Sequence, residues 1–468
     1  MRTFRYAQIW TIAYPILLST LMEQLIGMTD AAFLGRVGEI ELGASALGSI
    51  FYVAIFMIGL GFSIGAQILM GRRNGEGRYE QIGAIFYHSI AFLLLLALLL
   101  FCVTHWFAPY LLEKIIRSHQ VFEAANSYLQ WRVCGFVFAF VNALFRAFYV
   151  AITRTRTLTM NSMVLVLSNI LLNYSLIFGH WGMPAMGIAG AAIGSTLAEG
   201  ISLLFFIIYT RYQIPSARYG LHRFPRLHFN LLGSVFSISS WVMLQNFLSL
   251  STWFLFFLGV EHLGERSLAA TNIIRNISSF TFMMVIALSS TASTLVSNLM
   301  GQGEYEAVWP MLRRTIGLGF MILVPVLVLI GLFPTDVMHI FTNDEALMAT
   351  ALPALYVLIT SYIFTIPAQI LLHAVSGTGN TRIGLIFEFI SLCVYCIYVG
   401  VAIFCYGVNL FWCWVSEFVY HIFAFLLCFS YMRWGVGNIN RYNLEHQQSY
   451  SMRYEKSMLF ILLSDALG

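Results

Sequence analysis

The stretch IWTIAYPILLSTLMEQLIGMTDAAF, residues 9–33, is an apolar run that contains two carboxylates, Glu23 and Asp30. As a single helix it is long enough to cross the roughly 30 Å hydrocarbon core of a bilayer. A charged side chain in such a helix is costly, and its partners must face the protein interior. The run therefore predicts a membrane-spanning helix in which the two acids are candidate functional residues.

The composition excludes an ordinary soluble enzyme. Of the 468 residues, 59% are hydrophobic and only 10% are charged, whereas soluble domains carry about 25% charged residues. The net charge of +4 is small and does not indicate a nucleic-acid partner. The expected surroundings of this chain are membrane lipid.

Apolar windows like the first one recur along the whole chain. They lie near residues 9–33, 45–70, 81–108, 124–151, 157–178, 185–210, 230–260, 267–300, 311–333, 346–376, 383–406 and 408–432. Each window is long enough for a spanning helix. The sequence thus predicts an all-α integral membrane protein with twelve transmembrane helices.

The positions of the basic residues predict the orientation. With the N-terminus inside, most Lys and Arg residues outside the spans fall in cytoplasmic segments, and the outer loops hold only Arg36, Lys114, Arg117 and Arg266. This is the asymmetry that the positive-inside rule describes. We expect a multi-pass membrane protein with both termini in the cytoplasm; the family resemblance described below implies the bacterial cytoplasmic (inner) membrane.

The chain also repeats itself. SIGAQILMGRRNGEGRYEQIG (63–83) is echoed by STLVSNLMGQGEYEAVWP (293–310), and AFYVAITRTRT (147–157) by LHAVSGTGNTRI (372–383). The repeats predict two pseudo-symmetric six-helix halves. The N-terminal lobe covers 1–210, a basic cytoplasmic linker 211–229, the C-terminal lobe 230–433 and a cytoplasmic tail 434–468.

Repeated helical halves indicate a transporter and not an enzyme. Rocking one half against the other exposes a central site alternately to each side of the membrane. The sequence contains no Walker A motif, so ATP is not expected to be the direct energy source. We expect a secondary transporter that needs no cofactor.

Seven stretches resemble the multidrug and toxic compound extrusion (MATE) transporters, and they follow one another in the family's order. They are TDAAFLGRVGEIELGASAL (29–47), LMGRRNGEG (69–77), SNILLNYSLIFG (168–179), GIAGAAIGST (187–196), SLAATNI (267–273), NLMGQGEYE (298–306) and SGTGNTR (376–382). The resemblance implies an inner-membrane antiporter. Such a protein exports organic, often cationic and amphipathic, drug-like compounds in exchange for Na⁺ or H⁺.

The resemblance also implies a cation site built around Asp30 in the N-terminal half. Where several relatives have an Asn and then an Asp on the fifth helix, this chain has Asn169 and Asn173, and Ser195 stands at the usual Thr position. Asn169 and Asn173 are one turn apart, so both amides project from the same helix face. If the ion is Na⁺, Asp30, Asn169 and Asn173 are its expected ligands, because it prefers oxygen donors; the same pocket could instead hold a proton.

Two interpretations remain open for Glu23, which lies two turns before Asp30 on the same helix face. It could line a cavity for a cationic substrate, together with Arg146 and Arg275 of other spans, or serve as a second protonatable group. Alternatively, it could form a structural ion pair with one of those arginines. Both interpretations follow from the cost of an unpaired charge inside the membrane.

Three other acids fall in predicted spans. Glu199 and Glu417 occupy similar positions in the sixth span of each half, which is more typical of an architectural role. Glu388, close after Arg382, is expected near a cytoplasmic helix end. A second cation site, known from another branch of the family on its seventh and tenth helices, is not expected, because those spans carry no acids here.

The alternative function is a flippase for a lipid-linked oligosaccharide or a related polyprenyl-linked substrate. Such proteins share the helix count and the repeats, but a cavity for pyrophosphate is expected to be broadly cationic. The charges in the spans of this chain are mixed: the acids are Glu23, Asp30, Glu199, Glu388 and Glu417, and the arginines are Arg132, Arg146 and Arg275. We therefore expect the partners to be small organic molecules. We also expect the protein to be a monomer.

Overall fold

The computed structural model describes residues 5–116, 118–222 and 228–435. The predicted tail from residue 436 onward, residues 223–227 of the predicted linker and Arg117 lie outside the described residues. Within the described ranges every regular element is a helix. Twelve helical segments are long and apolar enough to cross a membrane, which confirms the predicted fold class.

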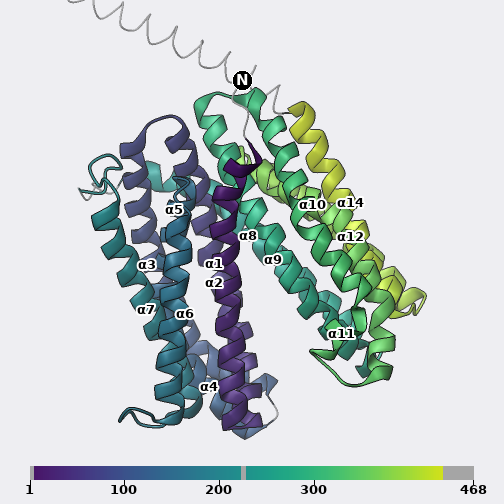
Figure 1. The fold of residues 1–468 in the computed structure, drawn as a ribbon. Coiled ribbons are helices and arrows are strands. Elements are labelled where there is room, and N and C mark those ends of the chain that lie inside the picture. Colours follow the sequence, from purple (N-terminus) through teal and green to yellow (C-terminus); the bar gives the residue numbers. More distant parts are fainter. Residues whose placement is uncertain (1–4, 117, 223–227, 436–468) are drawn as a thin grey trace, which may run out of the picture.

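The helices form two bundles that lie side by side (Figure 1). The first bundle comprises α1 (Tyr6–Val37), α2 (Glu39–Gly75), α3 (Tyr79–Ile115), α4 (His119–Arg132), η1 (Val133–Gly135), α5 (Phe136–Ala151), α6 (Arg156–Phe178) and α7 (Gly187–Gln213). The second comprises α8 (Phe229–Glu261), α9 (Glu265–Gln302), η2 (Tyr305–Ala307), α10 (Val308–Leu332), α11 (Pro334–His339), α12 (Glu345–Gly377), α13 (Thr381–Gly400), η3 (Val401–Cys405), α14 (Leu410–Ser430) and η4 (Tyr431–Gly435). Each bundle has its own hydrophobic core.

Several helices extend beyond their apolar windows. α1 and α2 are separated only by Gly38, although the windows predict a polar connection over 34–44. The polar residues on either side of Gly38 belong to the two helices, and Glu39 and Glu41 fall in the first turn of α2. Carboxylates are favourable there because they face the positive end of the helix dipole.

The two bundles meet in an interface near the end of the molecule where α1 begins, and they diverge toward the other end (Figure 1). We call this interface the seam; it is formed by the C-terminal half of α2 against α8 and α9. The Gln67 amide donates to the Thr294 hydroxyl at 2.9 Å, and the Asn74 amide donates to the Asn298 side-chain oxygen at 2.6 Å. These bonds join α2 of the first bundle to α9 of the second.

Glycines on α2 bring the backbones of the seam close together. A side chain on Gly65 would collide with the backbone of Ser239 on α8, and one on Gly75 would collide with the backbone of Asn298 on α9. Small residues are what membrane helices use to approach closely. The seam is therefore tightly packed and sensitive to added volume.

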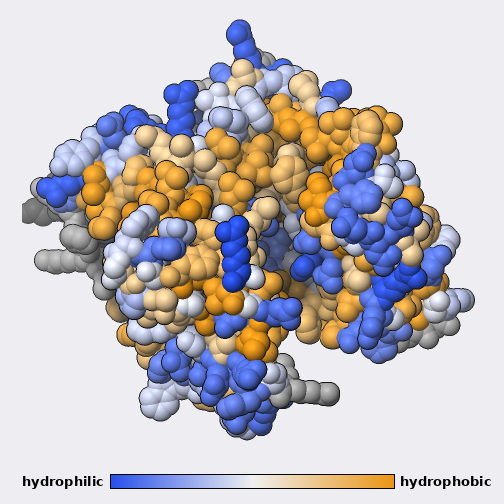
Figure 2. All heavy atoms as spheres, turned by 60° about the horizontal axis from the view of Figure 1, so that its bottom comes forward, coloured by the Kyte–Doolittle hydropathy of each residue, from blue (hydrophilic) through white to orange (hydrophobic). Residues whose placement is uncertain are grey.

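The diverging end leaves a hollow between the bundles. Figure 2, seen toward that end, shows the hollow near the centre of the molecule with hydrophilic side chains around it and apolar side chains on the surfaces beside it. α8 and α9 lie on the side of the second bundle that faces the first (Figure 1). The fold thus closes a central space at one end and opens it at the other.

We predict that added volume at Gly65 opens the seam. The pair Gln67→Cys and Thr294→Cys, in a background with the 7 native cysteines replaced, should form a disulfide across the seam. Because overpacking costs about 1–3 kcal/mol, Gly65→Leu should lower the cross-linked fraction roughly tenfold. Gly233→Leu on α8 is the control, since a side chain there meets nothing within 4 Å. Equal cross-linking in both variants would contradict this description of the seam.

Candidate functional site

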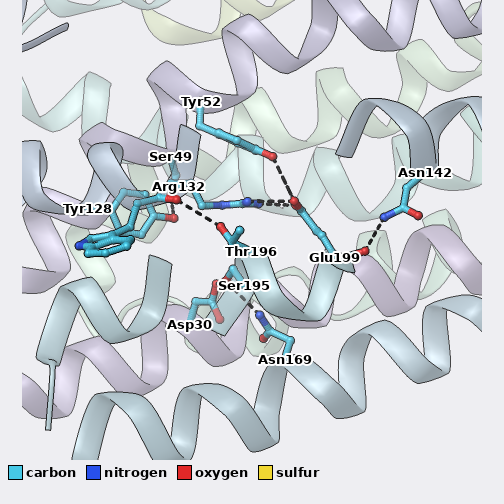
Figure 3. Close-up of polar contacts among 11 residues, drawn as sticks. Asp30, Ser49, Tyr52, Tyr128, Arg132, Asn142, Asn169, Ser195, Thr196 and Glu199 are labelled. Atoms are coloured by element: carbon cyan, nitrogen blue, oxygen red, sulfur yellow. Dashed lines mark hydrogen bonds and ion pairs between the residues drawn. The ribbon is translucent and has the colours of Figure 1, made fainter. Parts of the chain in front are cut away.

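Asp30 lies on α1 and is held by side chains from two other helices (Figure 3). The Asn173 amide on α6 donates to Asp30 Oδ1 at 2.6 Å, and the Ser195 hydroxyl on α7 donates to Asp30 Oδ2 at 3.3 Å. Both carboxylate oxygens are therefore engaged inside the first bundle. This placement argues against a carboxylate that merely reaches water at the membrane surface.

Asn169 completes the same cluster. Its amide donates to the Ser195 hydroxyl at 3.0 Å, and its side-chain oxygen accepts from the Asn173 amide at 3.3 Å. Asn169, Asn173 and Ser195 are 1%, 0% and 5% exposed. The structure thus brings together all four residues that the sequence suggested for a cation site, and we call them the Asp30 cluster.

Local geometry explains why these residues meet. Asn169 and Asn173 are one turn apart on α6, and α6 packs against both α1 and α7. Gly194 lets α7 approach, because a side chain at that position would collide with the side-chain oxygen of Asn173. Ser195, the next residue, then reaches the carboxylate.

The Asp30 cluster has an unused acceptor. The side-chain oxygen of Asn173 is buried and has no hydrogen-bond partner among the described residues. A buried polar atom without a partner is costly and calls for an explanation such as an ion or water. Two carboxylate oxygens, two amide oxygens and a hydroxyl form an oxygen-rich site suited to a hard cation. In the described part of the chain, no group of three His, Cys, Asp or Glu side chains could hold a metal ion.

A buried ion pair lies beside the Asp30 cluster (Figure 3). Arg132, at the end of α4, contacts Glu199 of α7 through two nitrogens at 2.6 and 3.1 Å. The Tyr52 hydroxyl donates to Glu199 at 3.3 Å, and the Arg132 guanidinium stacks on the Tyr52 ring, 3.9 Å from its centroid. Parallel nitrogen contacts to one carboxylate are the strong geometry of an arginine ion pair.

This pair positions the helix that carries Ser195. Glu199 follows Ser195 by one turn on α7, and its backbone oxygen also accepts from the Asn142 amide at 2.9 Å. The sequence marked Arg132 and Glu199 only as ionisable residues in different spans. Their pairing was not predicted, because spacing along the chain does not reveal which helices are neighbours.

Of the two arginines that the sequence offered as partners for Glu23, Arg146 forms the ion pair. Glu23 contacts Arg146 of α5 directly and accepts from the Ser162 hydroxyl of α6 at 3.2 Å. The Glu23 and Arg146 side chains are 31% and 27% exposed, so the pair is partly open to its surroundings. Arg275 of α9 does not take part in it and instead lies over the Phe257 ring of α8, 5.5 Å from its centroid.

In the second bundle, Glu388 is more enclosed than its expected position near a helix end suggested. The carboxylate is 2% exposed and accepts from the Ser249 hydroxyl of α8 at 2.6 Å and from the Tyr420 hydroxyl of α14 at 2.7 Å. α13 begins at Thr381, so Glu388 is two turns inside the helix, where α8 and α14 cover it. Glu417 lies 3.5 Å from the His421 ring one turn later on α14.

Comparison with known proteins gives a family match. The family model MatE matches residues 15–175 and again residues 242–402, once in each bundle. The chain is 26% identical over 390 residues to "Probable multidrug resistance protein NorM" of Thermotoga maritima, covering 81% of this chain and 82% of that protein. It is 27% identical over 355 residues to the protein of the same name from Synechocystis, covering 72% and 73%.

Solved structures share the fold. One described as the outward-facing conformation of a multidrug resistance MATE family transporter of the MOP superfamily superposes with a TM-score of 0.85 at 16% identity, over 94% of this chain and 99% of that one. The Vibrio cholerae MATE transporter VcmN in its bent form gives 0.82 at 18% identity, over 92% and 97%. At these identities the likeness concerns the fold alone.

The Arg132–Glu199 pair generates a prediction about stability. Arg132→Leu or Glu199→Leu alone leaves a buried charge without its partner, which costs about 3–5 kcal/mol. The double variant should recover most of that loss, because both charges are removed. Thermal unfolding of the purified protein measures this. Glu123→Leu, at an exposed position on the same helix as Arg132, is the control; single variants as stable as wild type would contradict the assignment.

Proposed function

The chain belongs to the MatE family, and from that premise we propose that it exports organic, drug-like compounds from a bacterium in exchange for an inward-moving cation. It is a multi-pass membrane transporter and not an enzyme. The proposed coupling ion is Na⁺ or H⁺, and the proposed location is the cytoplasmic membrane. Drug export is what the names of its relatives describe.

The Asp30 cluster is the observation that carries the coupling proposal. One carboxylate on α1 is surrounded by amide and hydroxyl groups of two other helices, and one buried amide oxygen lacks a partner in the described chain. A carboxylate so placed binds either a proton or a small cation with oxygen ligands. The cluster has a single acid, so at most one negative charge attracts the ion.

The closed seam and the open hollow support alternating access. With the basic loops on the cytoplasmic side, as the positive-inside rule predicts, the seam seals the inner end and the hollow opens outward. Releasing the seam and closing the other end would turn the same space toward the cytoplasm. Repeated halves around a central site are a recurrent design for this motion.

α1 is suited to link the ion to this motion. It carries Asp30 toward its outer end, while Ile9 and Ala13 in its first turns pack into the core of the second bundle. Pro15 lies between these two regions, and a proline inside a helix removes a backbone hydrogen bond and allows a bend. An ion that favours one shape of α1 would thereby favour one arrangement of the bundles. Coupling requires that ion and drug prefer different arrangements.

We predict that Asp30→Asn abolishes gradient-driven export. Purified protein in liposomes should move a fluorescent amphipathic drug uphill under an imposed Na⁺ gradient or an imposed pH gradient, and whichever gradient works identifies the ion. The variant keeps the shape and the amide hydrogen bonds but removes the charge that attracts a cation. Loss of uphill export with passive exchange retained is the expected result.

The matched control removes a carboxylate at an exposed position nearby. Glu39→Gln, in the first turn of α2, should export like wild type. Uphill export by Asp30→Asn equal to wild type would contradict the assignment of the ion to Asp30. A wild-type protein that responds to neither gradient would contradict antiport for the compounds tested.

A further inference from the structure

The carboxylates in the spans are engaged by the protein itself. Each has a charged or hydrogen-bonding partner: Glu23 with Arg146, Glu199 with Arg132, Asp30 with Asn173 and Ser195, Glu388 with Ser249 and Tyr420, and Glu417 beside His421. Two of the three arginines in the spans are therefore also neutralised. The third, Arg275, is not.

The charged side chain of Arg275 lacks a polar partner in the described part of the protein. In the described part of the chain its side chain makes no hydrogen bond and no ion pair, and its Nε is buried without a partner. The side chain is half-buried, and its guanidinium lies over the Phe257 ring. It sits ten residues into α9, about 15 Å along the helix from Glu265. A cation held at such depth without a carboxylate calls for an external partner.

The surroundings place Arg275 toward the hollow and not toward lipid. α9 contacts α1 and α2 of the first bundle, and Phe257 belongs to α8, which also faces that bundle (Figure 1). Neighbouring polar residues of α9 are likewise accessible, since Asn272 is half-buried and Asn276 is exposed. Such side chains are costly against hydrocarbon, so we infer that this face of α9 borders the space between the bundles and not lipid.

We propose that Arg275 and Phe257 form a binding site for an acidic group on the exported compound, so that the substrates include aromatic or amphipathic organic acids and zwitterions. This inference rests on the proposed export function and names the substrate class of its central space. It differs from the expectation of mainly cationic substrates, because Asp30 is assigned to the coupling ion and the other carboxylates of the spans already have partners.

The chemistry of arginine suits this role. A guanidinium presents two parallel nitrogens to a carboxylate and forms a bidentate pair, and its planar face stacks on aromatic rings. With one face on Phe257, the Arg275 plane is held in place while its outer nitrogens remain available. Lysine supplies the charge but neither the fork nor the stacking plane. Recognition should therefore depend on arginine as well as on positive charge.

The test compares two ligands that differ only in the acid. Rhodamine B carries a free carboxylate, and its ethyl ester is the same flat dye without that charge. Equilibrium binding to the purified full-length protein in lipid nanodiscs is measured by fluorescence anisotropy. Wild type should bind the acid more tightly than the ester. Arg275→Gln should weaken binding of the acid roughly tenfold, the size expected for a charge-assisted pair, and leave the ester within about twofold.

Two further variants distinguish recognition of the carboxylate by Arg275 from a general effect of removing positive charge. Arg275→Lys should retain part of the preference for the acid. Arg266→Gln removes one positive charge at the exposed outer end of the same helix and should bind both dyes like wild type. If Arg275→Gln weakens both dyes equally, or wild type shows no preference or binds neither, the proposal is overturned. Selective binding without gradient-driven transport would leave this site standing and contradict the antiport mechanism instead.

Discussion

The free-energy cost of placing a charged side chain in hydrocarbon constrains how the helices of this protein pack. Water cannot solvate a carboxylate or guanidinium within a span, so the protein must supply the partners or direct the side chain toward a water-filled space. Arg132 and Glu199 satisfy each other in the first bundle, and Ser249 and Tyr420 satisfy Glu388 in the second. These contacts cross between helices, and they fix how the helices are rotated about their axes.

The same cost separates structural from functional charges. The Arg132–Glu199 pair is enclosed and bidentate, so it holds α7 and offers nothing to a ligand. Asp30 is bound by neutral groups, beside an amide oxygen with no partner in the described chain, and so retains capacity for a cation. Arg275 retains capacity for an anion. An ion site and a substrate site can thus lie in different bundles and still be linked, because α1 and α9 are in contact.

Packing at the seam holds the two bundles together at one end of the molecule. Glycines on α2 allow the backbones to touch, and polar side chains such as Gln67 and Thr294 bond across the contact. An interface of this kind is closed or open as a unit, because a small displacement breaks several close contacts together. The hydrophobic cores also meet here, since Ile9 and Ala13 of α1 pack into the second core and Val235 of α8 and Ala287 of α9 into the first.

The sequence by itself determined the membrane character, the number of spans and the family. The spans follow from the length of each apolar run compared with the bilayer thickness, and the family follows from short motifs, and both are read along the linear sequence. It also suggested the Asp30 cluster, since Asn169 and Asn173 share a helix face and the family places them near Asp30. Only the tertiary structure decided that Glu199 pairs with Arg132, that Glu23 pairs with Arg146 and that Arg275 has no carboxylate partner among the described residues. Partners on different helices depend on helix packing and rotation, which hydropathy does not encode.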